Sequence, residues 1–126
     1  MLSVISTGKA PAAIGPYSQA ISDGRTIWAA GQLGLDPASA ELVSDNLEEQ
    51  ARQALTNLTA VLEAGGFSLD QVVAVDVFLT SMDDFAAFNK VYETFFATHR
   101  PARAVVAVAG LPKGGRVEIK CIASRG

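Results

Sequence analysis

Two amphipathic helical patterns alternate with runs of strand-forming residues, and this alternation limits the folds open to the chain. The first pattern begins near Asp45 and Glu48, which have capping-box spacing, and ends at Gly65-Gly66. Its apolar positions share one helical face: Leu47, Ala51, Ala54, Leu55, Leu58, Val61 and Leu62.

The second helix is predicted to begin after Ser81 and must end before Pro101, because the residue before a proline disfavours the helical conformation. Its apolar face is aromatic and comprises Phe85, Phe88, Tyr92, Phe95 and Phe96. Both helices therefore have a face that must be buried against another layer.

Strand patterns surround these helices. The expected strands are residues 2–6, Tyr17–Ser22, Thr26–Gln32, Gln71–Thr80, Ala104–Ala109 and Arg116–Ser124. Asp23-Gly24 is a hairpin signal, residues 10–16 form an ordered loop with two prolines, and residues 111–115 form a turn. Gln71–Thr80 is β-branched on both faces, which predicts a central strand covered on both sides.

The order β-β-β-α-β-α-β-β combines hairpins with two crossover helices. It predicts one α+β domain over residues 1–126, with a mixed β-sheet and both helices packed on one face. The other face of the sheet is then uncovered, and its apolar residues need a partner. We therefore expect a homo-oligomer.

Composition excludes several classes of protein. The net charge of −3 argues against binding nucleic acid through its phosphates, and no segment is long enough to cross a membrane. The single cysteine, Cys121, cannot form an internal disulfide, and no Cys/His cluster has metal spacing. These features favour a cytoplasmic protein without a metal. Seven of the ten Lys and Arg residues follow residue 82, so the C-terminal third either carries an anion site or only solvated charges.

Arg103 is the first candidate for ligand binding. It precedes six apolar residues, Ala104 to Ala109, and no acidic residue lies near it in sequence. A guanidinium at the entry of a buried strand needs a partner. That partner is either a distant Asp or Glu in a salt bridge or the carboxylate of a ligand, which a guanidinium can bind through two parallel hydrogen bonds.

Glu118 is the second candidate. It lies on the charged side of an alternating strand, either as an exposed neighbour of Lys120 or as a pocket carboxylate that orients a water. If the last two strands form a hairpin around residue 113, Arg103 pairs near residue 123. Arg103 and Glu118 are then roughly 16 Å apart along the ladder. One site that uses both would take them from different subunits.

Other side chains have an ordinary reading and a functional one. Tyr17, after Gly15-Pro16, is either a core tyrosine or a phenol that caps a pocket. Asn89 is either a surface residue or a hydrogen-bond partner of a loop, whereas His99 and Cys121 read as a loop residue and a core residue.

The chain resembles the Rid family, also called YjgF/YER057c/UK114, and in particular its enamine/imine deaminase branch. The similarity runs nearly end to end and rests on segments in a characteristic order: APAAIGPYSQ (10–19), AGQ (30–32), QARQALTNL (50–58), DFAAFNKVYETFF (84–96), PAR (101–103) and LPKGGRVEIKCIA (111–123).

The resemblance implies a chorismate-mutase-like fold and a homotrimer with clefts between its subunits. It implies cofactor-free hydrolysis of 2-imino acids, released as enamines by pyridoxal-phosphate enzymes, to 2-keto acids and ammonia. Arg103 then binds the substrate carboxylate and Glu118 handles the water.

The same resemblance implies that five other residues lie at or near the pocket: Tyr17, Gly31, Ala30, Val105 and Asn89. Many members of the branch have serine where this chain has Ala30, and polar residues where it has Ala104 and Val105.

The sequence is also compatible with two other functions. A non-catalytic trimer that senses small metabolites, or acts like a chaperone, could use the same cleft. An endoribonuclease activity, also ascribed to members of the family, is disfavoured by the net negative charge and the absence of a histidine pair.

Overall fold

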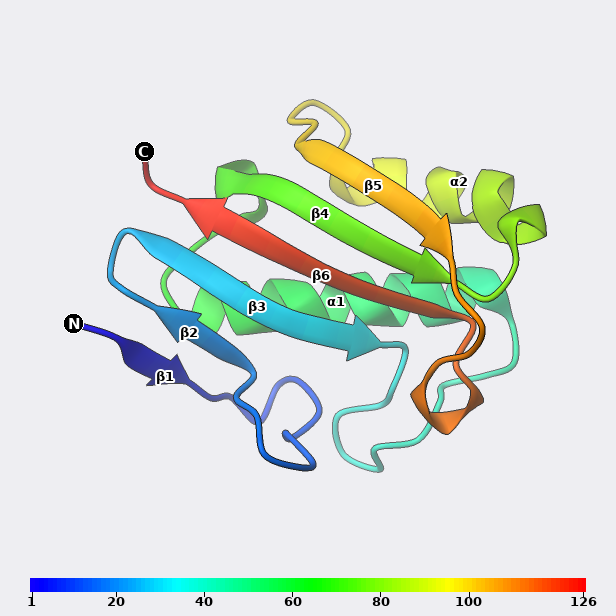
Figure 1. Cartoon of the computed structure of the whole chain (residues 1–126), viewed down its shortest axis with the longest axis horizontal. Coiled ribbons are helices and arrows are strands. Elements are labelled where there is room, and N and C mark those ends of the chain that lie inside the picture. The colour runs from blue at the N-terminus through cyan, green and yellow to red at the C-terminus, as the bar shows by residue number, and fades with distance from the viewer.

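The last strand of the chain lies inside a six-stranded sheet. The computed structural model describes all 126 residues, and its strands follow the spatial order β1-β2-β3-β6-β4-β5 (Figure 1). They are β1 (Ser3–Ile5), β2 (Ala20–Ser22), β3 (Thr26–Leu33), β4 (Val72–Leu79), β5 (Ala102–Ala107) and β6 (Val117–Ser124). Only β4 and β5 are parallel, so the sheet is mixed, as predicted.

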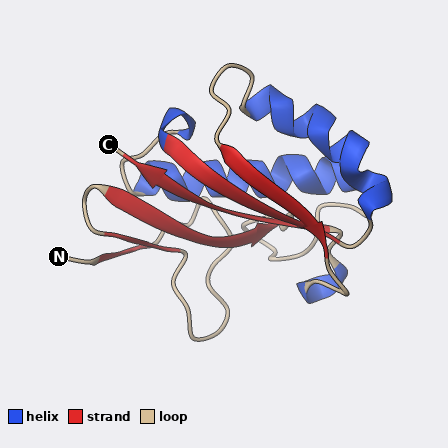
Figure 2. Cartoon of the chain, turned by 45° about the horizontal axis from the view of Figure 1, so that its top comes forward, coloured by secondary structure: helices blue, strands red, loops and turns tan.

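Both helices cover the same face of this sheet, as Figure 2 shows. They are α1 (Leu47–Ala64) and α2 (Phe85–Phe95), and short 3-10 turns occur at Leu69–Gln71, Met82–Asp84 and Pro112–Gly114. A cluster of 24 buried hydrophobic residues fills the space between helices and sheet. Neither helix is long and apolar enough to span a bilayer.

The predicted face of α1 is confirmed, because all seven of its apolar positions are buried. The helix ends at Ala64, Gly65 is its C-cap, and Gly66 takes a positive φ of 80°. The predicted cap was wrong by one residue: Asn46 is the N-cap, and its side-chain oxygen accepts a hydrogen bond from the Glu49 amide at 2.9 Å. Asn46 and Glu49 have the same spacing as Asp45 and Glu48, so the sequence pattern alone did not separate the two registers.

In α2 the aromatic face is confirmed in part. Phe88, Tyr92 and Phe96 are buried, but Phe85 is 36% exposed, and Val91 takes a core position that the aromatic pattern did not include. The helix ends at Phe95, before Pro101, as expected.

Two strand boundaries were wrong. Residues 17–19 belong to the loop before β2, where the Gln19 side chain bonds to backbone groups of Thr7 and Pro11. β5 begins at Ala102, two residues earlier than predicted, because its parallel ladder with β4 includes Ala102 opposite Ala74.

The expected hairpin between the last two strands was also wrong. β5 pairs only with β4, and Arg103 lies opposite Val75 instead of a residue near 123. The connection between β5 and β6 passes the end of β4. There the Val108 amide donates a hydrogen bond to the Leu79 carbonyl, and the Thr80 amide donates one to the Arg116 carbonyl. β6 then runs antiparallel to β3 and β4 and bonds to a strand on each side.

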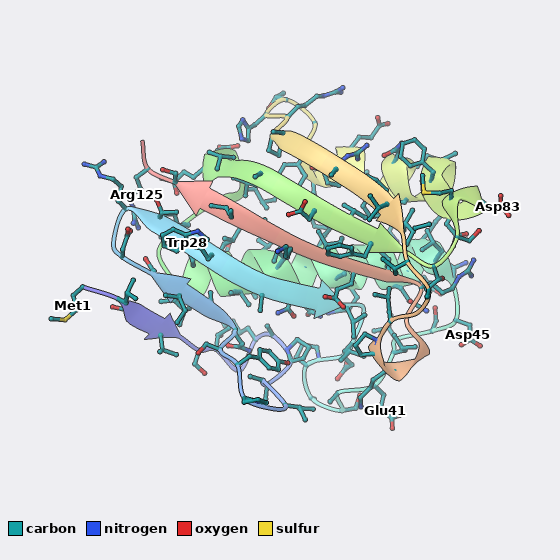
Figure 3. The ribbon with its side chains drawn as sticks, viewed as in Figure 1. Met1, Trp28, Glu41, Asp45, Asp83 and Arg125 are labelled. Carbon is teal, nitrogen blue, oxygen red and sulfur yellow. The ribbon has the colours of Figure 1, made fainter.

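β4 is covered on one face only within the chain, contrary to the prediction of cover on both sides. Val75, Val77 and Leu79 are buried under the helices, whereas Ala74, Asp76 and Phe78 are only partly buried on the other face. We call the face away from the helices the open face. One row of paired residues on it crosses all six strands and is apolar throughout: Val4, Ile21, Trp28, Ile122, Ala74 and Ala102. Trp28, labelled in Figure 3, is 43% exposed there.

A buried asparagine joins α1 to the end of β3. Asn57 is fully buried, and its Nδ2 donates hydrogen bonds to the carbonyl oxygens of Leu33 at 3.1 Å and Leu35 at 2.9 Å. Its Oδ1 accepts a bond from Gln53 at 2.8 Å. A buried polar side chain with all these partners holds the strand end in one position relative to the helix.

We predict that Asn57→Ala lowers the free energy of unfolding by about 2–4 kcal/mol, since it removes these hydrogen bonds and leaves a small cavity. Urea denaturation at matched protein concentration measures the loss. Thr56→Ala, at the exposed neighbouring position of α1, is the control and should change stability by less than about 0.5 kcal/mol. A loss of similar size in both variants would contradict the role given to Asn57.

Candidate functional site

The Arg103 side chain lies over α2, on the helix face of edge strand β5. Its Nη1 donates a hydrogen bond to Asn89 Oδ1 at 2.9 Å, and its guanidinium carbon lies 4.6 Å from the centre of the Tyr92 ring and 5.9 Å from that of Phe85. Positions 85, 89 and 92 share one face of a helix, so α2 forms a cradle under the guanidinium.

Arg103 has no acidic partner within the chain. The one salt bridge of the molecule joins Arg116 to Asp84, so the alternative that Arg103 is paired with a distant carboxylate does not hold. Asn89 accepts a hydrogen bond from Nη1 only, so the other N–H groups of the Arg103 guanidinium remain free to donate. This arrangement suits the bidentate binding of a ligand carboxylate.

A cavity of about 330 Å³ opens beside this guanidinium. Its lining comprises Asn89, Tyr92, Glu93, Phe96, Arg100, Pro101 and Arg103. Burial raises the pKa of the Tyr92 phenol, while the charge of Arg103 opposes this rise. Tyr92 therefore remains neutral at physiological pH and serves as an aromatic support.

Glu118 lies in a second cavity, of about 520 Å³, on the open side of the sheet. This cavity is walled by β3, by the loop 11–19 and by the turn at Pro112 and Lys113. Burial raises the pKa of the Glu118 carboxyl above its usual value of 4.5, and the positive charge of Lys120 partly opposes this rise. A half-buried carboxylate of raised pKa can take a proton from water more readily than an exposed one.

Tyr17 lines the Glu118 cavity and is 52% exposed, so it is a wall residue and not a core tyrosine. Its hydroxyl oxygen accepts a hydrogen bond from the Ile14 amide at 3.3 Å, which orients the ring against its own loop.

Gln19 anchors that loop from below. It is 3% exposed, accepts a bond from the Thr7 amide at 2.7 Å and donates to the carbonyl oxygens of Thr7 at 3.1 Å and Pro11 at 2.8 Å. It also donates to the Ala10 carbonyl oxygen at 3.4 Å. A buried amide that bonds four backbone groups holds the loop as a rigid wall.

Ala30 and Gly31 form the floor of the same cavity, at a bulge of β3. The pairing of β3 with β6 shifts register between Ala29 and Gln32, and on the other edge of β3 the Ala30 amide donates a hydrogen bond to the Gln19 carbonyl at 2.9 Å. The two predicted pocket residues thus lie beside Glu118.

Val105 shares a strand and a face of the sheet with Arg103. It lies on the helix face of β5, two residues after Arg103, and packs against the buried core. It lines neither the Arg103 cavity nor the Glu118 cavity. His99 holds the loop before β5, since its Nε2 lies 2.6 Å from the Val72 carbonyl oxygen.

The side chains of Arg103 and Glu118 lie on opposite faces of the sheet. Arg103 is opposite Val75, which is opposite Cys121, and both of these are buried against the helices. Glu118 is three residues from Cys121 along β6, and strand alternation turns it to the open face. With two strand spacings and three residues between them, their Cα atoms are roughly 14 Å apart. The hairpin predicted from the sequence was wrong, but Arg103 and Glu118 are still far apart, as it implied.

Sequence reasoning missed the polar groups that anchor the start of β6, next to Glu118. Arg116, two residues earlier, bonds both oxygens of Asp84 at 2.8 and 3.1 Å, and its amide donates to Gln50 Oε1 at 2.8 Å. Gln50 is 1% exposed and also donates to the Ser44 carbonyl at 2.9 Å. A glutamine on the buried stripe of α1 was the available signal for this contact, because a buried amide requires a partner.

Each chain therefore has two separate half-sites. One offers a guanidinium without an ionic partner, and the other offers a carboxylate in a walled cavity. Together the two groups could bind a small carboxylic acid and activate water at its neighbouring carbon, but within one chain they do not meet.

Comparison with known proteins identifies related sequences and structures. The family model described as "Endoribonuclease L-PSP" matches residues 7–125. The 2-iminobutanoate/2-iminopropanoate deaminase of Capra hircus is 54% identical over 98% of this chain and 90% of its own length. The human protein of the same name is 49% identical over the same shares.

Solved structures are similar over nearly their whole length. A putative endoribonuclease from Thermotoga maritima has a TM-score of 0.96 and 51% identity, covering 98% of each chain. Escherichia coli TdcF with bound serine has a TM-score of 0.94 and 38% identity, covering 98% of this chain and 99% of its own. The similarity in sequence and the shared fold show that this chain belongs to the endoribonuclease L-PSP family, also known as the YjgF or Rid family.

Proposed function

We propose that the protein is a 2-iminobutanoate/2-iminopropanoate deaminase, which hydrolyses small 2-imino acids to 2-keto acids and ammonia. The observation that carries this proposal is the end-to-end similarity to deaminases of that name, at 54% identity in one case. The unpaired Arg103 and the cavity carboxylate Glu118 supply the groups that this reaction needs.

In the proposed reaction, Arg103 binds the substrate carboxylate through the free side of its fork. The protonated imine is already electrophilic, so the protein mainly orients substrate and water. Glu118 accepts a proton as the water oxygen attacks C2, which gives a neutral carbinolamine. The same carboxyl then returns the proton to the nitrogen, the C–N bond breaks, and the hydroxyl proton leaves with ammonia as ammonium. Tyr17 and Ile14 wall the cleft, and every step uses side chains of the protein.

We further propose that the active assembly is a homotrimer in which the Arg103 half-site of one subunit faces the Glu118 half-site of its neighbour. Two features support a shared site: the half-sites lie on opposite faces of each sheet, and the open face carries an apolar row that includes Trp28. Val106, 46% exposed, adds to this surface. Cyclic packing of the open faces would bury it and close the cleft.

A metabolite sensor could use the same cleft without turnover. Release of keto acid from freshly generated 2-iminobutanoate separates the two functions directly. Catalytic release supports the deaminase, whereas binding of 2-ketobutanoate with no acceleration of imine hydrolysis would favour the sensor.

We predict that Arg103→Lys lowers kcat/KM for 2-iminobutanoate about ten- to a hundredfold, because the charge remains but the two parallel hydrogen bonds do not. Arg103→Ala should lose more. Arg52→Lys, at an exposed position of α1, controls for the exchange itself and should leave kcat/KM unchanged. Wild-type activity in Arg103→Ala would refute the carboxylate clamp.

The acidic side of the pH profile should report Glu118. Only the ionised carboxylate accepts a proton from water, so kcat should fall as the pH falls through a pKa raised above 4.5 by burial. Lys120 lowers this pKa by its charge, so Lys120→Gln should move the acidic limb to higher pH. Lys90→Gln, exposed on α2, should not move it. A limb that shifts to lower pH in Lys120→Gln would contradict the assignment to Glu118.

A further inference from the structure

The Glu118 carboxylate lies directly against Gly31. A Cβ added to Gly31 would be 2.0 Å from Glu118 Oε2, 2.8 Å from Cδ and 3.1 Å from Cγ. No side chain can occupy position 31 while Glu118 keeps this conformation, because real Cβ contacts below 3.0 Å are essentially absent from proteins.

The backbone of Gly31 does not itself require glycine. Its φ is outside the left-handed region, which Gly15, Gly24, Gly66, Gly114 and Gly126 adopt. Glycine inside a strand also costs roughly 0.5–1 kcal/mol relative to alanine, and it often marks a close approach of another group.

Three other glycines have equally little room, but for a different reason. A Cβ would meet the backbone of Gln50 at Gly34, and it would meet apolar side-chain carbons at Gly65 and Gly115. These three contacts belong to packing. Gly31 is the one glycine at which a Cβ would come within 3.0 Å of a charged group; at Gly66 the nearest such atom, Arg125 Nη2, is 3.1 Å away.

No hydrogen bond or salt bridge within the chain holds the Glu118 carboxylate in place. Burial and the charge of Lys120 account for its altered pKa, and no hydrogen bond to the carboxylate contributes. Its oxygens therefore remain available to a water and a substrate, while the position of the carboxylate depends on packing against β3. Lys113 and Tyr17 are the other polar side chains with an ionisable group in this cavity.

We propose that Gly31 is a positioning residue: the space left by its absent side chain seats the Glu118 carboxylate against the bulge of β3 and aims it at the water. This inference rests on the proposed function for its catalytic consequence, but the contact itself is independent of that function. It assigns to Gly31 a steric role toward Glu118 besides its place in the pocket floor.

Gly31→Ala tests the proposal without destroying the fold. The atoms that the new methyl would meet are the far end of a flexible side chain, so Glu118 can turn away while the strand stays in place. We expect kcat to fall about ten- to a hundredfold, because small displacements of a catalytic group have effects of this size. KM should change little, since Arg103 is untouched. Gly110→Ala, where a Cβ would meet nothing within 4 Å, should retain wild-type kcat.

A double-mutant cycle separates positioning from a general loss of structure. In a Glu118→Ala background there is no carboxylate to displace, so adding Gly31→Ala should lower the residual rate by less than about twofold. An equal loss in both backgrounds, or a wild-type kcat in Gly31→Ala, would overturn the proposal.

Carbon-13 NMR of the glutamate carboxyls keeps the test separate from the proposed function. The methyl should push the Glu118 carboxylate toward solvent, so its titration midpoint should fall toward 4.5 in Gly31→Ala and stay unchanged in Gly110→Ala. If the wild type shows no deaminase activity but this midpoint moves, the proposed function is wrong and the role of Gly31 is supported. If the midpoint does not move, the role of Gly31 is wrong, whatever the activity.

Discussion

The position of β6 between β3 and β4 determines most of what the molecule can do. A strand bonded on both edges cannot rotate, so its two-residue alternation sends Val117, Ile119 and Cys121 to the helices and Glu118 to the open face. β5 lies one strand beyond β4, at the edge, where Arg103 turns back onto α2. The two groups best suited to chemistry are therefore separated by the sheet itself. No side-chain rotation can bring the two groups together, so a site that uses both requires a second subunit.

The layers of the fold could be predicted from local patterns. Apolar periodicity located both helices, and the combination of hairpins with crossover connections indicated a mixed sheet with helices on one face. The pairing of the last two strands could not be predicted in this way. Adjacent strands often form hairpins, but whether β6 pairs with β5 or passes β4 depends on long-range packing that sequence spacing does not encode. β4 has apolar residues on both faces, yet within one chain only the face toward the helices is buried.

The candidate site was predictable to different extents at its different residues. Arg103 and Glu118 were identifiable because each is a charge placed beside apolar strand residues. Asn89 lies beside the site, but its observed contact is with the guanidinium. Gln19, Gln50 and Asn57 were missed, although each is a buried amide whose hydrogen bonds hold a loop or a strand end. Polar residues on an otherwise buried stripe give a weak signal, because their partners lie far away in sequence.

The central claim is that Arg103 and Glu118 of one active site come from different chains, and co-assembly of two inactive variants tests it most directly. Arg103→Ala and Glu118→Ala chains, inactive as separate preparations, are unfolded together at equal concentration and refolded. If the site is shared across a cyclic trimer interface, random assembly gives about one site in four with both residues intact, and imine hydrolysis should return to about a quarter of the wild-type rate. If both residues act within one chain, no mixed assembly contains an intact site. A mixture as inactive as its two components, with co-assembly verified by differently tagged chains, would contradict the account.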